Sequence, residues 1–181
     1  MLTLDRRTSL LLLVDLQGKL HPAIQDGAAV LREALRLAQL AKLFDVPVWA
    51  TEHCPDRIGP LLPELAALSE ITHHKTSFDA CRTAAFRAAL PVERTDIVIC
   101  GYEAHVCVMQ TALGLLGLGR RVWAVRDAMG SRRAASREAA LARLSRAGAE
   151  IITTEMAGFE WAEDAADPRW RSLLALVKEP G

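Results

Sequence analysis

The continuous apolar run SLLLLVD at residues 9–15 constrains the fold of this chain more than any other feature. A strand with one solvated face alternates apolar and polar residues, whereas a strand buried on both faces reads as an unbroken apolar stretch. TDIVICGY at 95–102 and RVWAVRDA at 121–128 are similar runs. Strands of this kind are typical of parallel sheets that helices cover on both sides.

Helical segments alternate with strand-like segments along the rest of the chain. Four stretches have the apolar spacing or the composition of helices: 28–44, 84–90, 106–119 and 132–148. Three more read as strands: 46–51, 70–77 and 149–155. Between them, residues 54–68 form a proline-broken excursion with one short helix expected near Pro63, and two short helices are expected after residue 155.

This alternation predicts the fold class. With right-handed crossovers, it gives a doubly wound, Rossmann-like three-layer α/β sandwich whose mostly parallel sheet has about six strands. At 181 residues the chain is expected to form a single domain over 1–181. Neither GxGxxG nor GxxxxGK[ST] follows the first strand, which argues against a dinucleotide site and a nucleotide-hydrolysing loop.

Charge and cysteine usage narrow the partners and the compartment. The 22 basic residues balance the 22 acidic ones, so neither nucleic acid nor an anionic membrane surface is expected as a partner. The first apolar run is far shorter than the roughly 20 residues that span a bilayer, and no secretory signal is apparent. The four cysteines have neither CxxC nor zinc-ligand spacing, so we expect free thiols in the cytoplasm.

Ligands of doubly wound sheets bind beyond the carboxyl ends of the strands, where the winding reverses. Cys107 lies in this region, between a predicted strand and a predicted helix. Unpaired N–H groups at a helix N-terminus favour a thiolate, which lowers the pKa of a cysteine there, and they can also bind an oxyanion. The alternative role is that of a small apolar filler, which is our interpretation of Cys100. Position alone leaves both roles open for Cys107.

Two charged residues are expected at the same edge. Asp15 ends the first strand, where a carboxylate can accept the thiol proton and return it to a leaving group, although a turn aspartate is commoner. Lys75 can hold Asp15 ionised and stabilise a thiolate, although a lone lysine is usually a solvated surface charge. Each signal is weak alone, and their convergence on one edge favours a catalytic site.

Four motifs carry a resemblance to a known family: LLLVDLQ at 11–17, HHKTSFDA at 73–80, GYEAHVCVMQTALGLLGLGRRVWAVRDA at 101–128 and AGAEIITTE at 147–155. With these motifs the sequence resembles the isochorismatase-like cysteine hydrolases. The resemblance covers essentially the whole chain in order, and HVCVMQTALGLL is its most specific part. The chain looks most like the branch of small isochorismatase-domain hydrolases.

The resemblance implies a catalytic triad. Asp15 corresponds to the general base and acid, Lys75 to the residue that tunes the electrostatics, and Cys107 to the nucleophile. The family also places a cis peptide upstream of the cysteine, which here corresponds to Tyr102–Glu103, and an oxyanion hole made by the N–H groups of Glu103 and Cys107. A non-proline cis bond costs about 3 kcal/mol, so it is expected only where function holds it.

The sequence also departs from relatives that bind a metal. Nicotinamidases in this superfamily carry an Asp-x-His metal site after the second strand, and WATEHCPDRIG at 49–59 lacks it. We therefore expect no metal and no dissociable cofactor. Gln17, Thr51, Glu52 and His53 are expected beside a small-molecule substrate, although a polar turn after a strand explains the last three equally well.

The leading hypothesis is a hydrolase of a small amide or related C–N carbonyl compound that works through an acyl-thioenzyme. A cysteine at 107 favours amide chemistry over cleavage of a vinyl ether. One alternative is a binding protein with little turnover, and another is a redox-reactive thiol protein that pairs Cys107 with Cys54, Cys81 or Cys100. Family members are commonly multimeric, so a homo-oligomer is expected. The terminal helices around Trp161 and Trp170 would either dock on a second subunit or pack within the chain.

Overall fold

A computed structural model describes residues 2–178. Its six strands form one sheet in the order β3-β2-β1-β4-β5-β6, and every neighbouring pair is parallel. The strands are β1 (Ser9–Val14), β2 (Val48–His53), β3 (Ile71–Lys75), β4 (Asp96–Gly101), β5 (Arg121–Met129) and β6 (Glu150–Ile152). The predicted doubly wound α/β fold is confirmed, and the winding reverses between β1 and β4.

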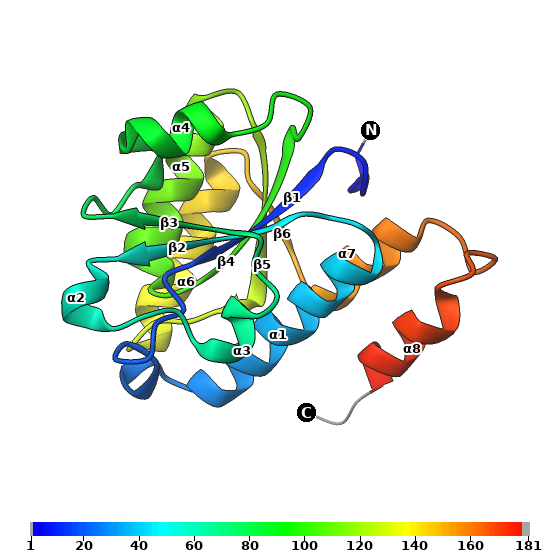
Figure 1. The fold of residues 1–181 in the computed structure, drawn as a ribbon, viewed down its shortest axis with the longest axis horizontal. Helices are drawn as coiled ribbons and strands as arrows, with labels where there is room; N and C mark the ends of the chain where they lie inside the picture. Colours follow the sequence, from blue (N-terminus) through cyan, green and yellow to red (C-terminus); the bar gives the residue numbers. More distant parts are fainter. Residues whose placement is uncertain (1, 179–181) are drawn as a thin grey trace.

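Helices cover both faces of the sheet and make the three layers (Figure 1). The main ones are α1 (Gly27–Leu43), α4 (Ala84–Ala89), α5 (Met109–Gly117), α6 (Ala134–Arg146), α7 (Thr154–Ala162) and α8 (Trp170–Lys178). In the figure, α1, α7 and α8 lie on one side of the sheet, and α4, α5 and α6 lie on the other. Within residues 2–178, no helix has the length and apolar composition that crossing a membrane requires.

The central strands are buried as their sequence predicts. All six residues of β1 and all six of β4 are buried, and Leu10 to Leu13 have no exposed surface. Edge strand β3 is different, because only Lys75 at its end is buried. The unbroken apolar runs therefore mark the middle of the sheet, where the site lies, whereas the edge strands have more polar sequences.

The proline-broken segment contains two short helices, α2 (Pro55–Ile58) and α3 (Pro63–Ala66), where the sequence predicted only the second. Each begins with a proline, whose fixed φ and missing N–H suit the first turn of a helix. Short helical turns also occur at His21–Ala23 and Ala80–Arg82. The segment from α2 to α3 runs over the carboxyl ends of the strands and provides part of the site.

The tryptophans of the last helices pack within the chain. Trp161 is fully buried and its indole N–H donates to the Ser9 hydroxyl at 3.0 Å. Trp170 contacts Phe159 edge to face, with ring centroids 5.5 Å apart. Leu173 of α8 is also fully buried, and α8 contacts α1 and α7. These apolar side chains of the terminal helices therefore pack within the chain, which was one of the two possibilities that the sequence left open.

Two backbone segments lie very close together at the switch point, the place between β1 and β4 where the winding of the sheet reverses. The Tyr102 amide donates to the Val14 carbonyl at 2.9 Å, which brings the end of β4 against the end of β1. Gly101 has a φ of +125°, and a Cβ on it would lie 2.0 Å from the same carbonyl oxygen. Only glycine fits there, since any side chain would collide with backbone. The residues after β1 and β4 are thereby held side by side.

Candidate active site

Asp15 directly follows β1 and is completely buried. Its φ of +52° is a left-handed conformation, which aspartate adopts more readily than most residues. The carboxylate accepts from the Thr51 hydroxyl at 2.7 Å through Oδ1 and from the Lys75 ammonium at 2.6 Å through Oδ2. Both carboxylate oxygens are therefore engaged by the protein.

Lys75 ends β3 and directs its ammonium into the interior. Only 1% of its side chain is exposed, and none of the Asp15 side chain is. A buried charge is very costly without a partner, and in this pair each group balances the charge of the other. The lone lysine of the sequence is thus one half of a buried ion pair two strands away from β1.

Cys107 lies across the switch point from this pair. It belongs to a π-helical turn, η3 (Ala104–Val108), that leads into α5, and it is 6% exposed. The Val108 amide donates to the Glu103 carbonyl, which is the wider spacing of a π-turn. Cys107 Sγ lies within 4.8 Å of an Asp15 carboxylate oxygen. The structure therefore brings Asp15, Lys75 and Cys107 to one place, as the motif order implied.

The electrostatics of Cys107 differ from those expected of a helix N-terminus. Burial raises the pKa of the Cys107 thiol above its usual value, the Asp15 carboxylate raises it further, and the Lys75 ammonium lowers it. The net direction is upward, so the expected low pKa is wrong. The resting group is a protonated thiol, because the apolar surroundings and the neighbouring carboxylate outweigh the lysine. A proton acceptor is consequently needed before the sulfur can attack.

Buried thiols make the folded protein sensitive to alkali. Burial raises the pKa of Cys81 to about 12 and raises the pKa values of Cys100, Cys107 and Tyr102 well above normal. The unfolded chain loses these protons first as pH rises, so this contribution to stability is complete below pH 9 and declines above it. We expect the free energy of unfolding to fall by roughly 1.4 kcal/mol per pH unit for each such group.

Urea unfolding under reducing conditions between pH 7 and 10.5 measures this decline. Cys100→Ala is the matched variant, since Cys100 is a fully buried thiol in the middle of the sheet. It should show a shallower decline than the wild type by the equivalent of one proton. Parallel pH profiles for the two proteins would contradict the assignment.

The turn before Cys107 differs from the cis peptide that the resemblance implied. Every peptide bond in residues 2–178, including Tyr102–Glu103, is trans. The Tyr102 hydroxyl lies 3.0 Å from His21 Nδ1, and its ring is buried. The Glu103 carboxylate accepts from the backbone N–H and the guanidinium of Arg132, each at 3.1 Å. The trans turn is held by these side-chain contacts and by the Gly101 approach to Val14, so no cis bond is required to place Cys107.

Three of the expected substrate contacts are occupied by the protein itself. The Gln17 amide accepts from the His53 N–H at 2.8 Å and donates to the His53 carbonyl at 3.2 Å and to the Gly59 carbonyl. Thr51 donates to Asp15. Glu52 accepts from the Leu61 N–H at 2.7 Å and pairs with His74 at 3.0 Å. These residues hold the site and its covering loop in position.

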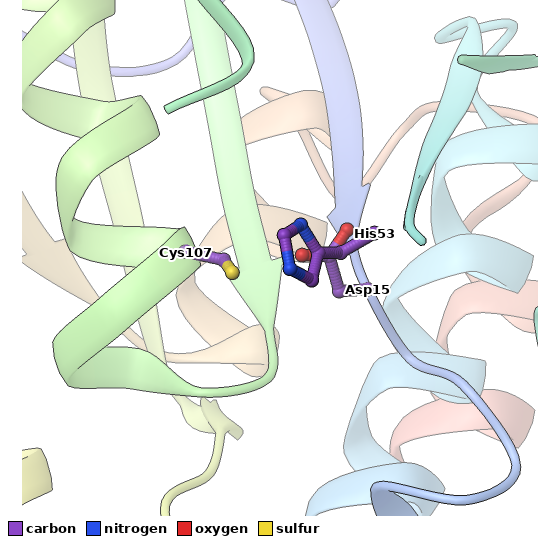
Figure 2. A group of neighbouring side chains, drawn as sticks. All are labelled: Asp15, His53 and Cys107. Atoms are coloured by element: carbon purple, nitrogen blue, oxygen red, sulfur yellow. The ribbon is translucent and has the colours of Figure 1, made fainter. Parts of the chain in front are cut away.

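His53 differs from these neighbours because its imidazole faces the site. One ring nitrogen lies within 4.8 Å of both the Cys107 sulfur and an Asp15 oxygen. Figure 2 shows the ring beside the Asp15 carboxylate, with the Cys107 sulfur pointing toward it from the other side of the switch point. The sequence suggested His53 as a substrate contact, but it could not show that the ring points toward Cys107 and Asp15, because the direction of a side chain after a strand depends on the tertiary packing.

A cleft of about 850 Å³ opens beside this group and reaches it at His53 and Lys75. It is lined by His53, Lys75 and other residues of the strand ends and of the segments that follow them: Cys54, Pro55, Asp56, Arg57, His74, Thr76, Phe78 and Thr83. Its size suits a small molecule. The start of the proline-broken segment thus forms one wall of the cleft.

The cluster of Asp15, His53 and Cys107 contains donor types that bind zinc. The fit is poor, since the Lys75 ammonium already occupies Asp15 Oδ2 at 2.6 Å and would repel a cation. The two histidines of β3, His73 and His74, are not part of this cluster. His73 packs against the rings of Trp49 and Phe86, and His74 pairs with Glu52. The donor set therefore does not support a resident metal.

The fold and the site together define a class: a three-layer α/β protein with a cysteine beside a buried Asp–Lys pair at the switch point of a parallel sheet. The family model of the isochorismatase domain matches residues 9–156. The chain belongs to this family and is, at that level, a hydrolase. The isochorismatase domain-containing protein 2 of Rattus norvegicus is 34% identical over 173 residues, which cover 96% of this chain and 82% of the relative.

Solved structures of related proteins have the same fold. The MAR1 ribonuclease of Caenorhabditis elegans superposes with a TM-score of 0.92 at 28% identity, covering 99% of this chain and 95% of its own. YcaC of Pseudomonas aeruginosa, solved with hexane-2,5-diol and covalent acrylamide, gives 0.90 at 27% identity, covering 97% and 91%. YcaC of Escherichia coli, described as an octameric hydrolase of unknown specificity, gives 0.85 at 28% identity, covering 97% and 96%.

Proposed function

We propose that this protein is a cysteine-dependent hydrolase of a small amide or related C–N carbonyl compound. The observation that carries the proposal is the buried Asp15–Lys75 pair, with its 2.6 Å contact, beside the Cys107 thiol. A protonated nucleophile, a carboxylate able to accept its proton and a cation that balances the charge of the carboxylate are the parts that acyl transfer needs. The site requires no dissociable cofactor for this chemistry.

In the proposed reaction, Asp15 takes the thiol proton as Cys107 Sγ attacks the carbonyl carbon. The oxyanion that forms accepts hydrogen bonds from the N–H groups of Glu103 and Cys107. Asp15 then returns the proton to the leaving nitrogen, the C–N bond breaks, and an acyl-thioenzyme remains. Water hydrolyses this thioester and restores the thiol.

Two features support this choice over other chemistry. Acrylamide reacts with nucleophilic thiols, and a relative with the same fold carries it covalently. The cleft over Lys75 and His53 has the volume of a small-molecule site. The ribonuclease activity belongs to the nematode relative, and the balanced charge of this chain gives no reason to expect a polyanion here.

Alkylation by iodoacetamide at neutral pH tests the electrostatics of the proposed nucleophile. Lys75→Met should slow labelling of Cys107 several-fold, because Lys75 lowers the pKa of this thiol. Asp15→Asn should speed labelling while abolishing turnover, because Asp15 raises the pKa of the thiol but is also the proposed proton carrier. Peptide mass spectrometry over time gives the rate at each cysteine.

The experiment uses a Cys54→Ser background, since Cys54 is a half-buried thiol that lines the cleft next to His53. Buried Cys81 and Cys100 report unfolding, and only variants in which they stay unlabelled are compared. A labelling rate at Cys107 that neither substitution changes would contradict the proposal. Labelling that responds as expected without any acyl transfer would indicate a binding protein instead, and a disulfide to Cys107 under mild oxidation would indicate a redox role.

We also propose a domain organisation, an oligomeric state and a cellular compartment for this protein. We propose that residues 1–181 act as one domain, since α8 packs on α1 although the family match ends at 156. The octameric relative supports a homo-oligomer, which sedimentation analysis would measure. All four cysteines are free thiols, which supports a reducing cytoplasm.

A further inference from the structure

His53 is held in a fixed place at the end of β2. Its backbone N–H and carbonyl both bond to the buried amide of Gln17, and its ring contacts Phe78 with centroids 5.2 Å apart. The two hydrogen bonds to Gln17 fix the backbone from which the side chain extends, and the contact with Phe78 restricts the rotation of the ring. The imidazole is therefore positioned by three separate contacts.

The imidazole retains hydrogen-bonding capacity that the protein does not use. Nδ1 is buried and has no hydrogen-bond partner among residues 2–178. Buried polar atoms are almost always satisfied, so an unused nitrogen beside a cleft indicates that a molecule entering the cleft bonds to it. One ring nitrogen also lies within 4.8 Å of the Cys107 sulfur, a separation that one attacking water attached to an acyl carbon can bridge.

Asp15 is badly placed to activate such a water. It has no exposed surface, and its two oxygens already accept hydrogen bonds from Thr51 and Lys75. Its remaining lone pairs can exchange a proton with the adjacent sulfur and with a leaving nitrogen held against that sulfur, but no part of the carboxylate is open to water that enters through the cleft. His53 lines the cleft directly. The two steps of thioester chemistry thus have different candidate bases.

We propose that His53 is the catalytic base of deacylation, which rests on the acyl-thioenzyme proposed above. The neutral imidazole takes one proton from water as the water oxygen bonds to the thioester carbon. Collapse of the tetrahedral intermediate breaks the C–S bond, and the sulfur leaves as a thiolate. The imidazolium then gives its proton to the sulfur, which releases the carboxylic acid and restores the neutral thiol and imidazole.

Hydrolysis of 4-nitrophenyl acetate separates the two steps. Its initial burst of nitrophenolate reports acylation of Cys107, and the later steady rate reports deacylation. His53→Gln should keep the burst amplitude and rate while lowering the steady rate by about 100-fold or more, the usual contribution of a general base. Intact-mass spectrometry should show the variant accumulating one acetyl group, and free imidazole should restore part of the steady rate.

His105→Gln is the matched control, because His105 lies on the turn of Cys107 but its ring is bonded to Ser131 at 3.0 Å. It should leave both phases unchanged. His53→Asn, checked for native circular dichroism, replaces His53→Gln if that variant does not fold. An unchanged steady rate, or an equal loss of burst and steady rate without imidazole rescue, would overturn the role of His53 alone. A wild type that shows no burst and no acetylated Cys107 would instead overturn the acyl-thioenzyme itself.

Discussion

Replacing Cys107 with alanine is expected to abolish acyl transfer while leaving the fold intact. Loss of the nucleophile in enzymes of this kind lowers kcat by about 10⁴-fold or more, since no other group can form the covalent intermediate. The free energy of unfolding should change by only about 1 kcal/mol, because the side chain is small and makes no ion pair. Steady-state hydrolysis of 4-nitrophenyl acetate and of a small-amide panel, together with urea unfolding, measures the two effects.

Cys100→Ala provides the control for this experiment. Cys100 has the same side chain, is fully buried in β4 and has no proposed role in the reaction. Its removal should leave kcat within a factor of about two of the wild type, although it creates a small cavity. Retention of full activity in Cys107→Ala, or equal losses in both variants, would contradict the assignment of the nucleophile.

The second large effect is expected from breaking the buried ion pair. Lys75→Met leaves the Asp15 carboxylate without its cation in a site closed to solvent, which typically costs about 3–5 kcal/mol of unfolding free energy. Asp15→Asn should be costly for the same reason, since it leaves a buried ammonium. In the double variant neither charge is left unpaired, so its loss should be clearly smaller than the sum of the two single losses.

Activity should respond differently from stability in this set. All three variants should lack turnover, because each lacks the proposed proton carrier, the cation or both. The double variant recovers part of the stability and none of the activity. Chemical unfolding of the four proteins closes the double-mutant cycle, and Lys42→Met serves as the control, since Lys42 forms a half-exposed pair with Glu70. Strictly additive losses would show that Asp15 and Lys75 do not act as a pair.

The sheet could be predicted closely from the sequence because its signals are local. The runs at 9–15 and 95–102 contain β1 and β4, and the run at 121–128 matches β5 to within one residue. Alternation with helices predicted parallel neighbours. The helix predicted at 28–44 lies at Gly27–Leu43. The short helix α2 was missed, since four residues after Pro55 carry too little periodicity to be distinguished from a loop.

The site was only partly predictable. Asp15, Lys75 and Cys107 stand in motifs next to strand or helix ends, so the topology was sufficient to place them at one edge. The direction of the Cys107 pKa shift could not be predicted from the topology, since it depends on how deeply the thiol is buried and how close Asp15 lies. The same holds for Gln17, whose amide turned out to clamp the backbone of His53.

The sequence is enough to give the order of the elements, the sheet edge that holds the candidate site and the three residues expected there. These follow from hydrophobic periodicity, from the motifs and from the rule that parallel strands share a carboxyl edge. The three-dimensional structure was needed to show that Tyr102–Glu103 is trans, that Cys107 rests as a thiol and that His53 faces it. Those properties depend on distances and burial between segments far apart in the chain, because solvation and Coulomb energies change over a few ångströms that no sequence pattern records.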